Sequence, residues 1–497
     1  MARYVIALDQ STRSTKAFLY DQQGSVVRRA SLAHAQLVSS QGWISHDLNE
    51  IYHNVCATIA ALFADGKYEP DAVAGIGLTN QRETVAAWSR ADGHALGKAV
   101  VWQCTRAKPQ CERMRQHYPD LSAQVMTRTG LPLSPLFPAA KFAWLLEEVP
   151  AVQQAAANGD LCLGTIDSWL VYRLTHGAVF ATEPSNASRT QLFDLQTKRW
   201  DAELCQAFGI PMQALPEVRA SDADFGMTDC EGLFREPVPL GAVLGDSQAA
   251  LFGQSGEHLG DLKITYGTGS SIMVNVGSHP VRSHAGLVTS IGWQCAGDYQ
   301  YVLEGNVNYA GAMLAWLQDG FGILASPADA QKLALAANPS DQTVIVPAFT
   351  GLGAPYWQPQ AQAAILNMSA ATKAPELVKA ALDAIAFQIN AVIAAMRKDD
   401  VALASTVAVD GGPTRNDYLM QVQSDLSAVT VKVSDIEDIS AFGVALLAGS
   451  RLGVLDKAQN YLQYRAFRPQ ITEAERTRRI ASWQAAVKTV IAQSQQV

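Results

Sequence analysis

The amino-terminal segment consists of two apolar runs separated by one polar turn. Tyr4 to Leu8 and Ala17 to Tyr20 are rich in residues that favour strands, whereas Gln10 to Lys16 carries several hydroxyl side chains. This pattern predicts a β-hairpin whose tip presents the Asp9 carboxylate, hydroxyl groups and backbone N–H groups to an anion. The segment alone leaves two equal alternatives, a site for a phosphate and its metal or an ordinary hairpin with a polar turn.

Two later segments repeat features of this hairpin. Residues 262 to 277 predict a strand, a turn of small residues (Gly267 to Ser270) and a second strand. From residue 407, a predicted strand ends at Asp410 and is followed by a diglycine and by a helix that begins near Asn416. The two hairpins predict a duplicated architecture that holds a phosphate between its halves.

Helical patterns alternate with predicted strands along the chain, which is typical of α/β layers. A glycine-rich polar stretch, Gly253 to Gly260, precedes the second hairpin, so we expect two lobes, residues 1 to 254 and residues 255 to 497. A cleft between such lobes can close and exclude water from a reactive phosphate. The predicted helices include Asn49 to Ala64, Ala139 to Glu148, Val307 to Leu317, Glu376 to Met396 and Glu473 to Val497.

Composition narrows the classes of function. The chain has 497 residues with 48% hydrophobic content, enough for two or more domains, and its net charge of −8 argues against a nucleic-acid surface. Its 7 cysteines include no C-x-x-C pair, which favours reduced thiols in the cytoplasm over disulfides or zinc. The start MARYVIALD is not typical of a signal peptide, and no apolar run approaches the ~18 residues of a membrane span.

Asp246 is the candidate general base. It follows an apolar strand that ends at Gly245, at the point where a helix is predicted to begin. A carboxylate there can accept the proton of a hydroxyl that attacks a phosphate. Taken alone, the GDS triplet is equally typical of a helix N-cap, and Ser247 is a further N-cap candidate.

Arg82 and Glu83 follow the predicted strand VAGIGLT directly. An arginine fork donates hydrogen bonds to vicinal hydroxyls and a carboxylate accepts them, which together suit a polyol. The ordinary alternative is an exposed ion pair on a loop. Trp102 follows a further apolar strand and would give the carbon chain of a substrate an apolar wall, with a core tryptophan as the alternative.

In order along the chain, these segments resemble the ribonuclease-H-like, actin and hexokinase type ATPases. From about residue 4 to about residue 485 the chain is similar to the FGGY carbohydrate kinases, and within them to the glycerol kinases. The segments that carry the resemblance are DQSTRSTK (9 to 16), GLTNQRET (77 to 84), VVWQCTR (100 to 106), GTIDSWLVYRLT (164 to 175), NASRT (186 to 190), GDSQAALFGQ (245 to 254), YGTGSS (266 to 271), PAFTGLGAPYW (347 to 357) and VDGGPTRND (409 to 417).

The resemblance implies two actin-like lobes around a cleft and an ATP- and Mg²⁺-dependent kinase. Such an enzyme transfers the γ-phosphate to a terminal hydroxyl of glycerol, giving glycerol 3-phosphate, or to that of a closely related polyol. It acts on a small molecule in the cytoplasm. It can be a dimer or a tetramer. The first lobe would hold the acceptor pocket and the second the adenosine site. The implied residues are Asp246 as catalytic base; Arg82, Glu83, Trp102 and Asp246 for the substrate; Thr12, Arg13, Ser14, Lys16, Thr268, Gly269, Gly311, Gly412 and Asn416 for the nucleotide; and Asp9 for the metal.

The chain departs from the glycerol kinase pattern in its acceptor pocket. Leu136 replaces a tyrosine, Ser271 a phenylalanine and Ser247 a glutamine, so we expect a wider pocket with a different polarity. Losing one hydrogen bond from such a site costs roughly 1–3 kcal/mol. A tetritol, a pentitol or a ketopentose is therefore the alternative acceptor.

Further departures lie elsewhere in the chain. Ser11 replaces a glycine and Arg13 a hydroxyl residue in the first hairpin, Ala315 replaces a glutamine near the nucleotide, and Asn367 interrupts a family signature. The loop from Cys230 to Pro237 lacks the glycine-rich basic character with which glycerol kinases bind a sugar bisphosphate inhibitor.

Other classes of function fit less well. The first strand lacks the G-x-G-x-x-G of a nicotinamide site, and the run Gly93 to Ala99 is one residue short of a Walker motif. An actin-like ATPase or nucleotide sensor remains as a rival, but it would have no need of Arg82, Glu83, Trp102 and Asp246.

Overall fold

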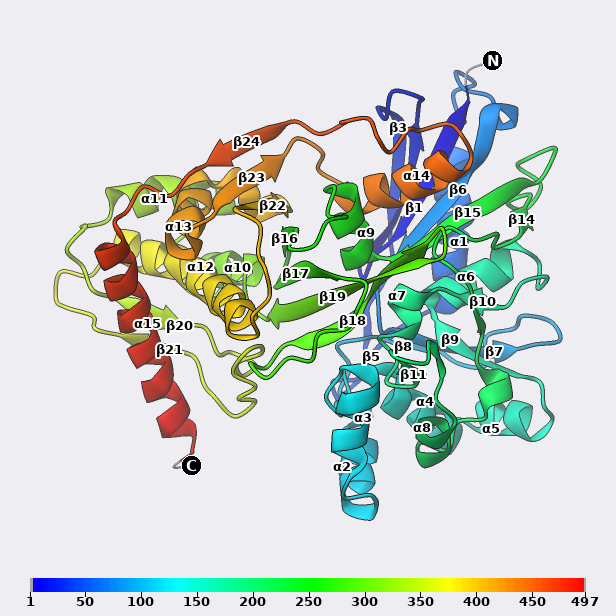
Figure 1. The fold of residues 1–497 in the computed structure, drawn as a ribbon, viewed down its shortest axis with the longest axis horizontal. Helices are drawn as coiled ribbons and strands as arrows, with labels where there is room; N and C mark the ends of the chain where they lie inside the picture. Colours follow the sequence, from blue (N-terminus) through cyan, green and yellow to red (C-terminus); the bar gives the residue numbers. More distant parts are fainter. Residues whose placement is uncertain (1–2, 496–497) are drawn as a thin grey trace.

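The computed structural model describes residues 3 to 495 and consists of two lobes, each built on a mixed β-sheet flanked by helices (Figure 1). This confirms the predicted α/β class. In order across the first sheet, the strands are β14 (Met227–Thr228), β15 (Val238–Gly245), β6 (Val73–Asn80), β1 (Tyr4–Gln10), β2 (Ser14–Tyr20) and β3 (Val26–Ala33). The second sheet runs β18 (Val288–Cys295), β19 (Asp298–Val307), β17 (Ser270–Gly277), β16 (Leu262–Tyr266), β22 (Thr406–Asp410), β23 (Thr430–Ser434) and β24 (Tyr464–Phe467).

The two sheets repeat one pairing scheme. β1 pairs antiparallel with β2 and parallel with β6, and β16 pairs antiparallel with β17 and parallel with β22. Both predicted hairpins therefore exist, each in the centre of its sheet. β1 is apolar along most of its length because it is covered on both faces, as expected of a central strand. The duplication predicted from the two hairpins is a property of the fold.

A third sheet extends the first lobe and carries part of the acceptor side. Its strands are β4 (Leu37–Val38), β5 (Ile44–His46), β8 (Ala99–Val100), β7 (Val85–Ser89) and β9 (Leu161–Thr165). Three two-stranded sheets pair β10 (Ala181–Thr182) with β13 (Glu217–Val218), β11 (Phe193–Asp194) with β12 (Arg199–Trp200), and β20 (Val344–Val346) with β21 (Ala364–Leu366).

Helices cover both sheets. Those of the first lobe are α1 (Leu48–Ala61), α2 (Lys108–His117), α3 (Leu121–Thr129), α4 (Pro138–Glu148), α5 (Pro150–Ala157), α6 (Ile166–Leu174), α7 (Pro184–Ala187), α8 (Ala202–Ala207) and α9 (Asp246–Gly253). The rest of the chain forms α10 (Gly311–Asp319), α11 (Ala330–Ala336), α12 (Ala374–Lys398), α13 (Asp417–Ser427), α14 (Ile439–Arg451) and α15 (Glu473–Ser494). The helix predicted from Val307 begins instead at Gly311, because Val307 still pairs with Ser270 as the last residue of β19.

The α14 helix lies against the first lobe, although it comes from near the end of the chain. Figure 1 shows it beside β1 and β6, and its apolar residues share a core with Val5 and Leu244. The chain thus returns to the first lobe after building the second sheet. The division of the chain between residues 254 and 255 stays a prediction.

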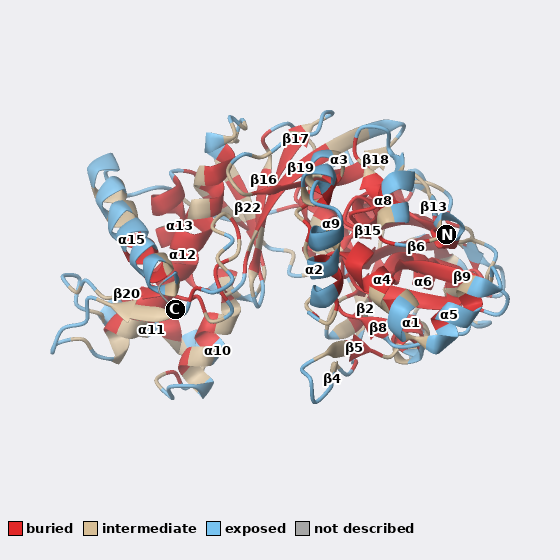
Figure 2. Ribbon diagram, turned by 90° about the horizontal axis from the view of Figure 1, so that it is seen from below, coloured by how far each residue is buried: buried red, intermediate tan, exposed pale blue. Residues whose placement is uncertain are grey.

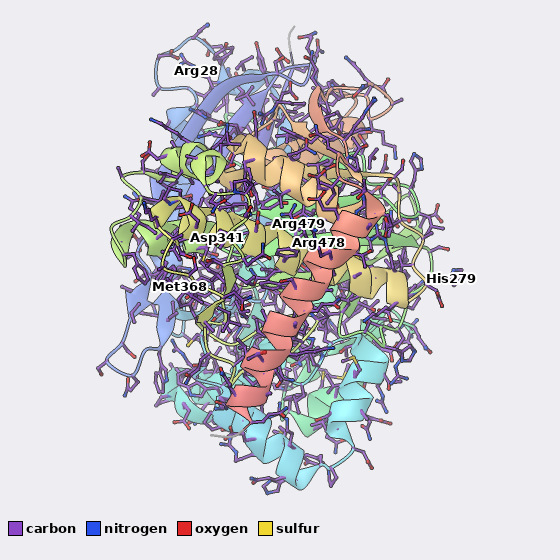
Figure 3. The ribbon with its side chains drawn as sticks, turned by 90° about the vertical axis from the view of Figure 1, so that its left-hand side faces the viewer. Arg28, His279, Asp341, Met368, Arg478 and Arg479 are labelled. Carbon is purple, nitrogen blue, oxygen red and sulfur yellow. The ribbon has the colours of Figure 1, made fainter. Side chains whose placement is uncertain are left out.

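The α12 helix is the central helix of the second lobe. It is long and apolar enough to cross a membrane by length and composition, but most of its apolar stretch is buried within the lobe (Figure 2). On its outer side lies α15, where the Trp483 ring stacks on Phe387 at 5.3 Å between ring centroids. Arg479 lies on the amino-terminal half of α15 (Figure 3) and donates to Asp383 of α12. These contacts identify α12 as a core helix.

The helices α9 and α14 cross at glycines. A Cβ atom added at Gly443 of α14 would lie 1.9 Å from the carbonyl oxygen of Ala249, and one at Gly253 would lie 2.7 Å from that of Ile439. Both distances are below any contact that real Cβ atoms make. The close approach of the two helices therefore requires glycine at position 443.

We predict that Gly443→Ala destabilises the protein. Helix propensity alone would favour alanine by about 1 kcal/mol, but the forced separation of α9 and α14 should lower the free energy of unfolding by about 1–3 kcal/mol. Urea denaturation measures the difference. Gly97→Ala is the control, because the nearest atom to its added Cβ is a Val149 methyl at 3.7 Å. Equal stability of the two variants would contradict the prediction.

Candidate active site

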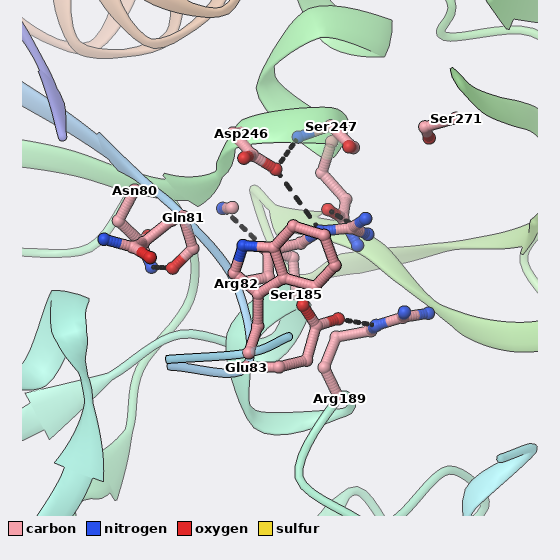
Figure 4. Close-up of polar contacts among 12 residues, drawn as sticks. Asn80, Gln81, Arg82, Glu83, Ser185, Arg189, Asp246, Ser247 and Ser271 are labelled. Carbon is pink, nitrogen blue, oxygen red and sulfur yellow. Dashed lines mark hydrogen bonds and ion pairs between the residues drawn. The ribbon is translucent and has the colours of Figure 1, made fainter. Parts of the chain in front are cut away.

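Arg82 and Glu83 lie just after β6 and are both buried. Arg82 donates two hydrogen bonds to Glu304, at 3.1 and 2.8 Å, and its Nε lies 3.3 Å from Asp246 (Figure 4). Glu83 accepts a bond of 2.6 Å from Arg189 Nε. The two neighbours therefore do not form the exposed ion pair that was the alternative interpretation.

Glu304 joins the two lobes. It lies on β19 with no exposed surface, and its carboxylate binds Arg82 and also Arg189, whose Nη1 lies 2.8 Å from Oε2. The two guanidinium groups hold the pKa of Glu304 well below its usual range in spite of burial. The sequence predicted no role for Arg189, which lies in the NASRT segment, or for Glu304, whose strand carries no local signal.

Asp246 is the first residue of α9. Gly245 occupies the N-cap position, so the Asp246 carboxylate does not cap the helix from there; it accepts a bond of 2.6 Å from Ser247 N–H. Its side chain is 38% exposed. Desolvation raises its pKa, and the Arg82 charge opposes that increase. A partly accessible carboxylate with a raised pKa is suited to accept a proton.

Lys141, which our sequence analysis did not single out, fixes the backbone around the acceptor residues. This fully buried side chain on α4 donates to the carbonyl oxygens of Glu83 (3.1 Å), Trp102 (3.1 Å) and Leu136 (2.5 Å). Burial lowers its pKa to about 7, and the Glu83 charge opposes the decrease. Trp102 in turn donates from Nε1 to Thr12 Oγ1 at 3.0 Å. One lysine and one indole thus connect the acceptor side to the first hairpin.

Two serines that depart from the glycerol kinase pattern lie on the same side of Asp246 (Figure 4). Ser271 Oγ donates to Glu304 at 2.9 Å and accepts from Lys263 Nζ at 3.2 Å. The Ser247 hydroxyl has no hydrogen-bond partner among residues 3 to 495. The third departure, Leu136, is brought to this region by its carbonyl bond to Lys141.

The first hairpin tip is closed by Ser11. Its backbone N–H and its hydroxyl both donate to the Ser14 carbonyl at 2.9 Å, so serine replaces glycine without loss of the turn. Lys16 forms an ion pair of 2.6 Å with Asp438. Arg13 is exposed, and within the described part of the chain its guanidinium forms no ion pair. The Arg13 guanidinium therefore remains available to bind an anion at the tip of the hairpin.

Asp9 lies near the end of β1, beside the polar tip of this hairpin, and is 6% exposed. Burial raises its pKa to about 7, the Lys16 charge opposes this, and the charges of Asp246 and Asp438 add to it. Between residues 3 and 495, no three acidic, histidine or cysteine side chains are grouped to hold a metal ion. A carboxylate among other carboxylates nevertheless suits a cation that keeps most of its water, as Mg²⁺ does.

The second hairpin tip packs against the start of α10. The Thr268 carbonyl accepts from Ala310 N–H at 2.9 Å. A Cβ atom at Gly269 would lie 2.3 Å from the Val307 carbonyl oxygen, and one at Gly311 would lie 2.7 Å from that of Gly267. Because Gly269 and Gly311 have no side chains, the start of α10 can lie next to the hairpin tip. Thr268, Gly269 and Gly311, three of the residues predicted to bind the nucleotide, are therefore close together.

A cavity of 830 Å³ opens between α10, α11 and the diglycine turn. Asn416 caps α13 and contributes to its wall, and a Cβ atom at Gly412 would meet no atom within 4 Å. The cavity brings together three residues predicted for the nucleotide. Its wall consists of Gly311, Leu314, Ala315, Pro327, Ala328, Gln331, Lys332, Leu335, Gly412, Pro413, Arg415 and Asn416.

Comparison with known proteins gives a consistent result. The model of the FGGY family of carbohydrate kinases, N-terminal domain, matches residues 4–253, and that of the C-terminal domain matches residues 262–452. The chain is 39% identical over 492 residues to glycerol kinase 1 of Thermotoga maritima, covering 98% of this chain and 99% of that protein. It is 40% identical over 490 residues to the glycerol kinase of Burkholderia cenocepacia, covering 98% and 97%.

Solved structures agree with this. The glycerol kinase of Plasmodium falciparum, crystallised with ADP, has a TM-score of 0.92 and 31% identity, covering 98% of each chain. The gluconate kinase of Lactobacillus acidophilus has a TM-score of 0.87 at 19% identity, covering 100% of each chain, and shows the fold alone.

We predict that Lys141→Met weakens acceptor binding. The variant leaves three carbonyl groups of the acceptor region without their donor, at a cost of roughly 1–3 kcal/mol each when they stay buried. The KM for the acceptor should rise at least about tenfold while the KM for the nucleotide stays within about twofold, as measured by steady-state kinetics. An equal rise in both KM values would contradict a role specific to the acceptor.

The lowered pKa of Lys141 predicts that the stability of the protein depends on pH. Because the folded pKa of about 7 lies below the ordinary value of 10.5, the unfolded chain binds more protons between these pH values. The free energy of unfolding of the wild type should therefore rise relative to Lys141→Met from pH 7 to pH 10, by at most about 4 kcal/mol. Denaturant titrations at several pH values test this; a difference that is constant or falls with pH would contradict it.

Proposed function

The chain belongs to the FGGY family of carbohydrate kinases, and on this premise we propose that it transfers the γ-phosphate of ATP to a terminal hydroxyl of glycerol, giving glycerol 3-phosphate. It is a phosphotransferase with an alcohol group as acceptor. The observation that carries this proposal is the cluster at the lobe junction in which the buried Arg82 and Glu83 lie together with the partly exposed Asp246. A sensor or a plain ATPase needs no such acceptor set.

The free atoms of the acceptor residues support the roles that we propose for them. Arg189 binds one oxygen of Glu83, which leaves the other oxygen to accept a bond from a substrate hydroxyl. Arg82 donates to a neighbouring hydroxyl, and Trp102 gives the carbon chain an apolar wall. Asp246 accepts the proton of the attacking hydroxyl late in phosphoryl transfer, when the bond to phosphorus has largely formed.

The nucleotide would lie along both hairpins and reach the cavity. Backbone and hydroxyl groups of Thr12, Ser14, Thr268 and Gly269 suit the phosphates, and the base would enter the cavity beside Gly311, Gly412 and Asn416. Arg13 supplies an available positive charge, whereas that of Lys16 is already paired with Asp438.

Asp9 would hold Mg²⁺ through water molecules, since a single buried carboxylate near two others fits a hydrated divalent cation. Bound Mg²⁺ supplies charge that neutralises the phosphate oxygens. We propose the cytoplasm as the compartment, because all seven cysteines are free thiols.

We predict that Asp246→Asn lowers kcat by about 10²–10⁴-fold, because asparagine cannot accept the proton. ATP binding, measured by calorimetry, should persist. Asp71→Asn serves as the matched control, since Asp71 is exposed and remote from the cluster. Unchanged turnover in Asp246→Asn would contradict the assignment of the base, and absence of glycerol-dependent ADP release in the wild type would contradict the proposed function.

The serines beside Asp246 favour a second candidate acceptor, a four- or five-carbon polyol or ketopentose. Ser247 offers an unbonded hydroxyl group to a longer chain of hydroxyls, and Ser271, whose hydroxyl binds Glu304, is a smaller side chain than the phenylalanine of the glycerol kinase pattern. We predict that Ser271→Phe raises the ratio of kcat/KM for glycerol to kcat/KM for a tetritol about tenfold. The phenylalanine ring would fill the space beside Ser247 that a longer acceptor needs. A wild type that turns over glycerol faster than all longer polyols would exclude this candidate.

A further inference from the structure

His34 follows β3 directly and is buried beside the tip of the first hairpin. Its ring Nε2 lies 3.1 Å from the Thr12 carbonyl oxygen, and its backbone N–H donates to the Arg13 carbonyl oxygen at 3.1 Å. A carbonyl oxygen can only accept a hydrogen bond, so Nε2 must carry a proton. One residue therefore binds two consecutive carbonyl groups of the tip.

The surroundings of His34 keep its ring in this state. Burial lowers the pKa of His34, and the bond to Thr12 opposes the decrease, so the ring is neutral at pH 7 and carries its one proton on Nε2. The His46 ring of β5 packs edge-on against it at 4.7 Å between ring centroids, and His46 Nδ1 donates to the Ala35 carbonyl at 3.1 Å. The segment that carries His34 is thus fixed to the third sheet.

The bond from the His34 ring sets the orientation of the peptide group between Thr12 and Arg13. In a planar trans peptide, the carbonyl bond and the N–H bond point in opposite directions. Because the Thr12 carbonyl points to His34, the Arg13 N–H points away from it. Within residues 3 to 495, this N–H has no hydrogen-bond partner. It is a free backbone donor at the tip, of the kind that binds phosphate.

The Thr12 side chain offers a second donor. An indole N–H can only donate, so Thr12 Oγ1 accepts the bond of 3.0 Å from Trp102 Nε1 and keeps its own hydroxyl proton. In the described part of the chain, that hydroxyl donates to no protein acceptor. Thr12 is therefore held by its carbonyl from His34 and by its hydroxyl from Trp102, and the two free donors lie on adjoining residues.

We propose that His34 is a positioning residue for phosphate binding. It holds the peptide between Thr12 and Arg13 in the orientation in which the Arg13 N–H donates to a phosphate oxygen of ATP. Without the imidazole, this peptide can turn over and present the Thr12 carbonyl oxygen, which repels an anion. The inference rests on the proposed function, in which the phosphates lie along both hairpins, and deepens it by adding a residue that acts through Thr12 and Arg13.

The binding of ATP and of adenosine, each measured by calorimetry without glycerol, tests this role. Adenosine is the reference ligand because it carries no phosphate. In His34→Phe, which keeps a ring and removes the donor, the Kd of ATP should rise at least about fivefold and that of adenosine should stay within about twofold. His34→Asn should behave in the same way, because its shorter side chain does not bring the amide group to the position of Nε2.

His34→Gln is the rescue variant, because its longer side chain can place an NH₂ group at the position of Nε2, so its Kd for ATP should stay within about twofold of the wild type. His53→Phe makes the same change as His34→Phe at an exposed position of α1 and should leave both Kd values unchanged.

Three results would overturn the inference. These are an unchanged Kd for ATP in His34→Phe and His34→Asn, an equal rise in His34→Gln, and an equal rise in the Kd values of ATP and adenosine. A wild type that binds ATP but releases no ADP when glycerol is added would instead overturn the proposed kinase function and leave the role of His34 intact.

Discussion

The arrangement of the active site depends on one buried carboxylate, that of Glu304. It belongs to the second sheet but is bound by two arginines of the first lobe, Arg82 and Arg189. Burying a charge is costly unless it is paired and hydrogen-bonded, and here both conditions hold. The same two arginines then reach Asp246 and Glu83, so the base and the substrate-binding carboxylate take their positions from Glu304. The acceptor site is complete only when both lobes are in contact.

A second set of contacts joins the acceptor to the phosphates. Lys141 holds the backbones of Glu83, Trp102 and Leu136, and the Trp102 indole binds Thr12 at the tip of the first hairpin. A shift of the hairpin would therefore be transmitted to the wall of the acceptor pocket. In-line transfer needs the hydroxyl and the phosphorus held within a fraction of an ångström of their productive distance, and these few bonds supply that restraint.

Local patterns in the sequence were sufficient for features formed by neighbouring residues. Both hairpins, the strand that ends at Gly245 and the helix that Asn416 caps follow from apolar periodicity and turn chemistry. Lys141 and Glu304 could not be found in this way, because most of their partners lie on distant segments and burial of a charged residue has no local signature. The start of α10 was wrong by four residues because β19 continues to Val307, where pairing with β17 outweighs helical periodicity. The roles of the site residues rest on the resemblance, and the geometry shows which of them can act together.

The return of α14 to the first lobe has a consequence for the order in which the protein is made. One face of the first sheet, including Val5, Ala7 and Leu244, is covered by residues from Ile439 onward. During translation this face emerges from the ribosome long before its cover has been synthesised. The nascent amino-terminal half therefore carries an apolar surface that only the last part of the chain can bury, and a fragment cut between the lobes would keep that surface exposed to aggregation or to chaperones.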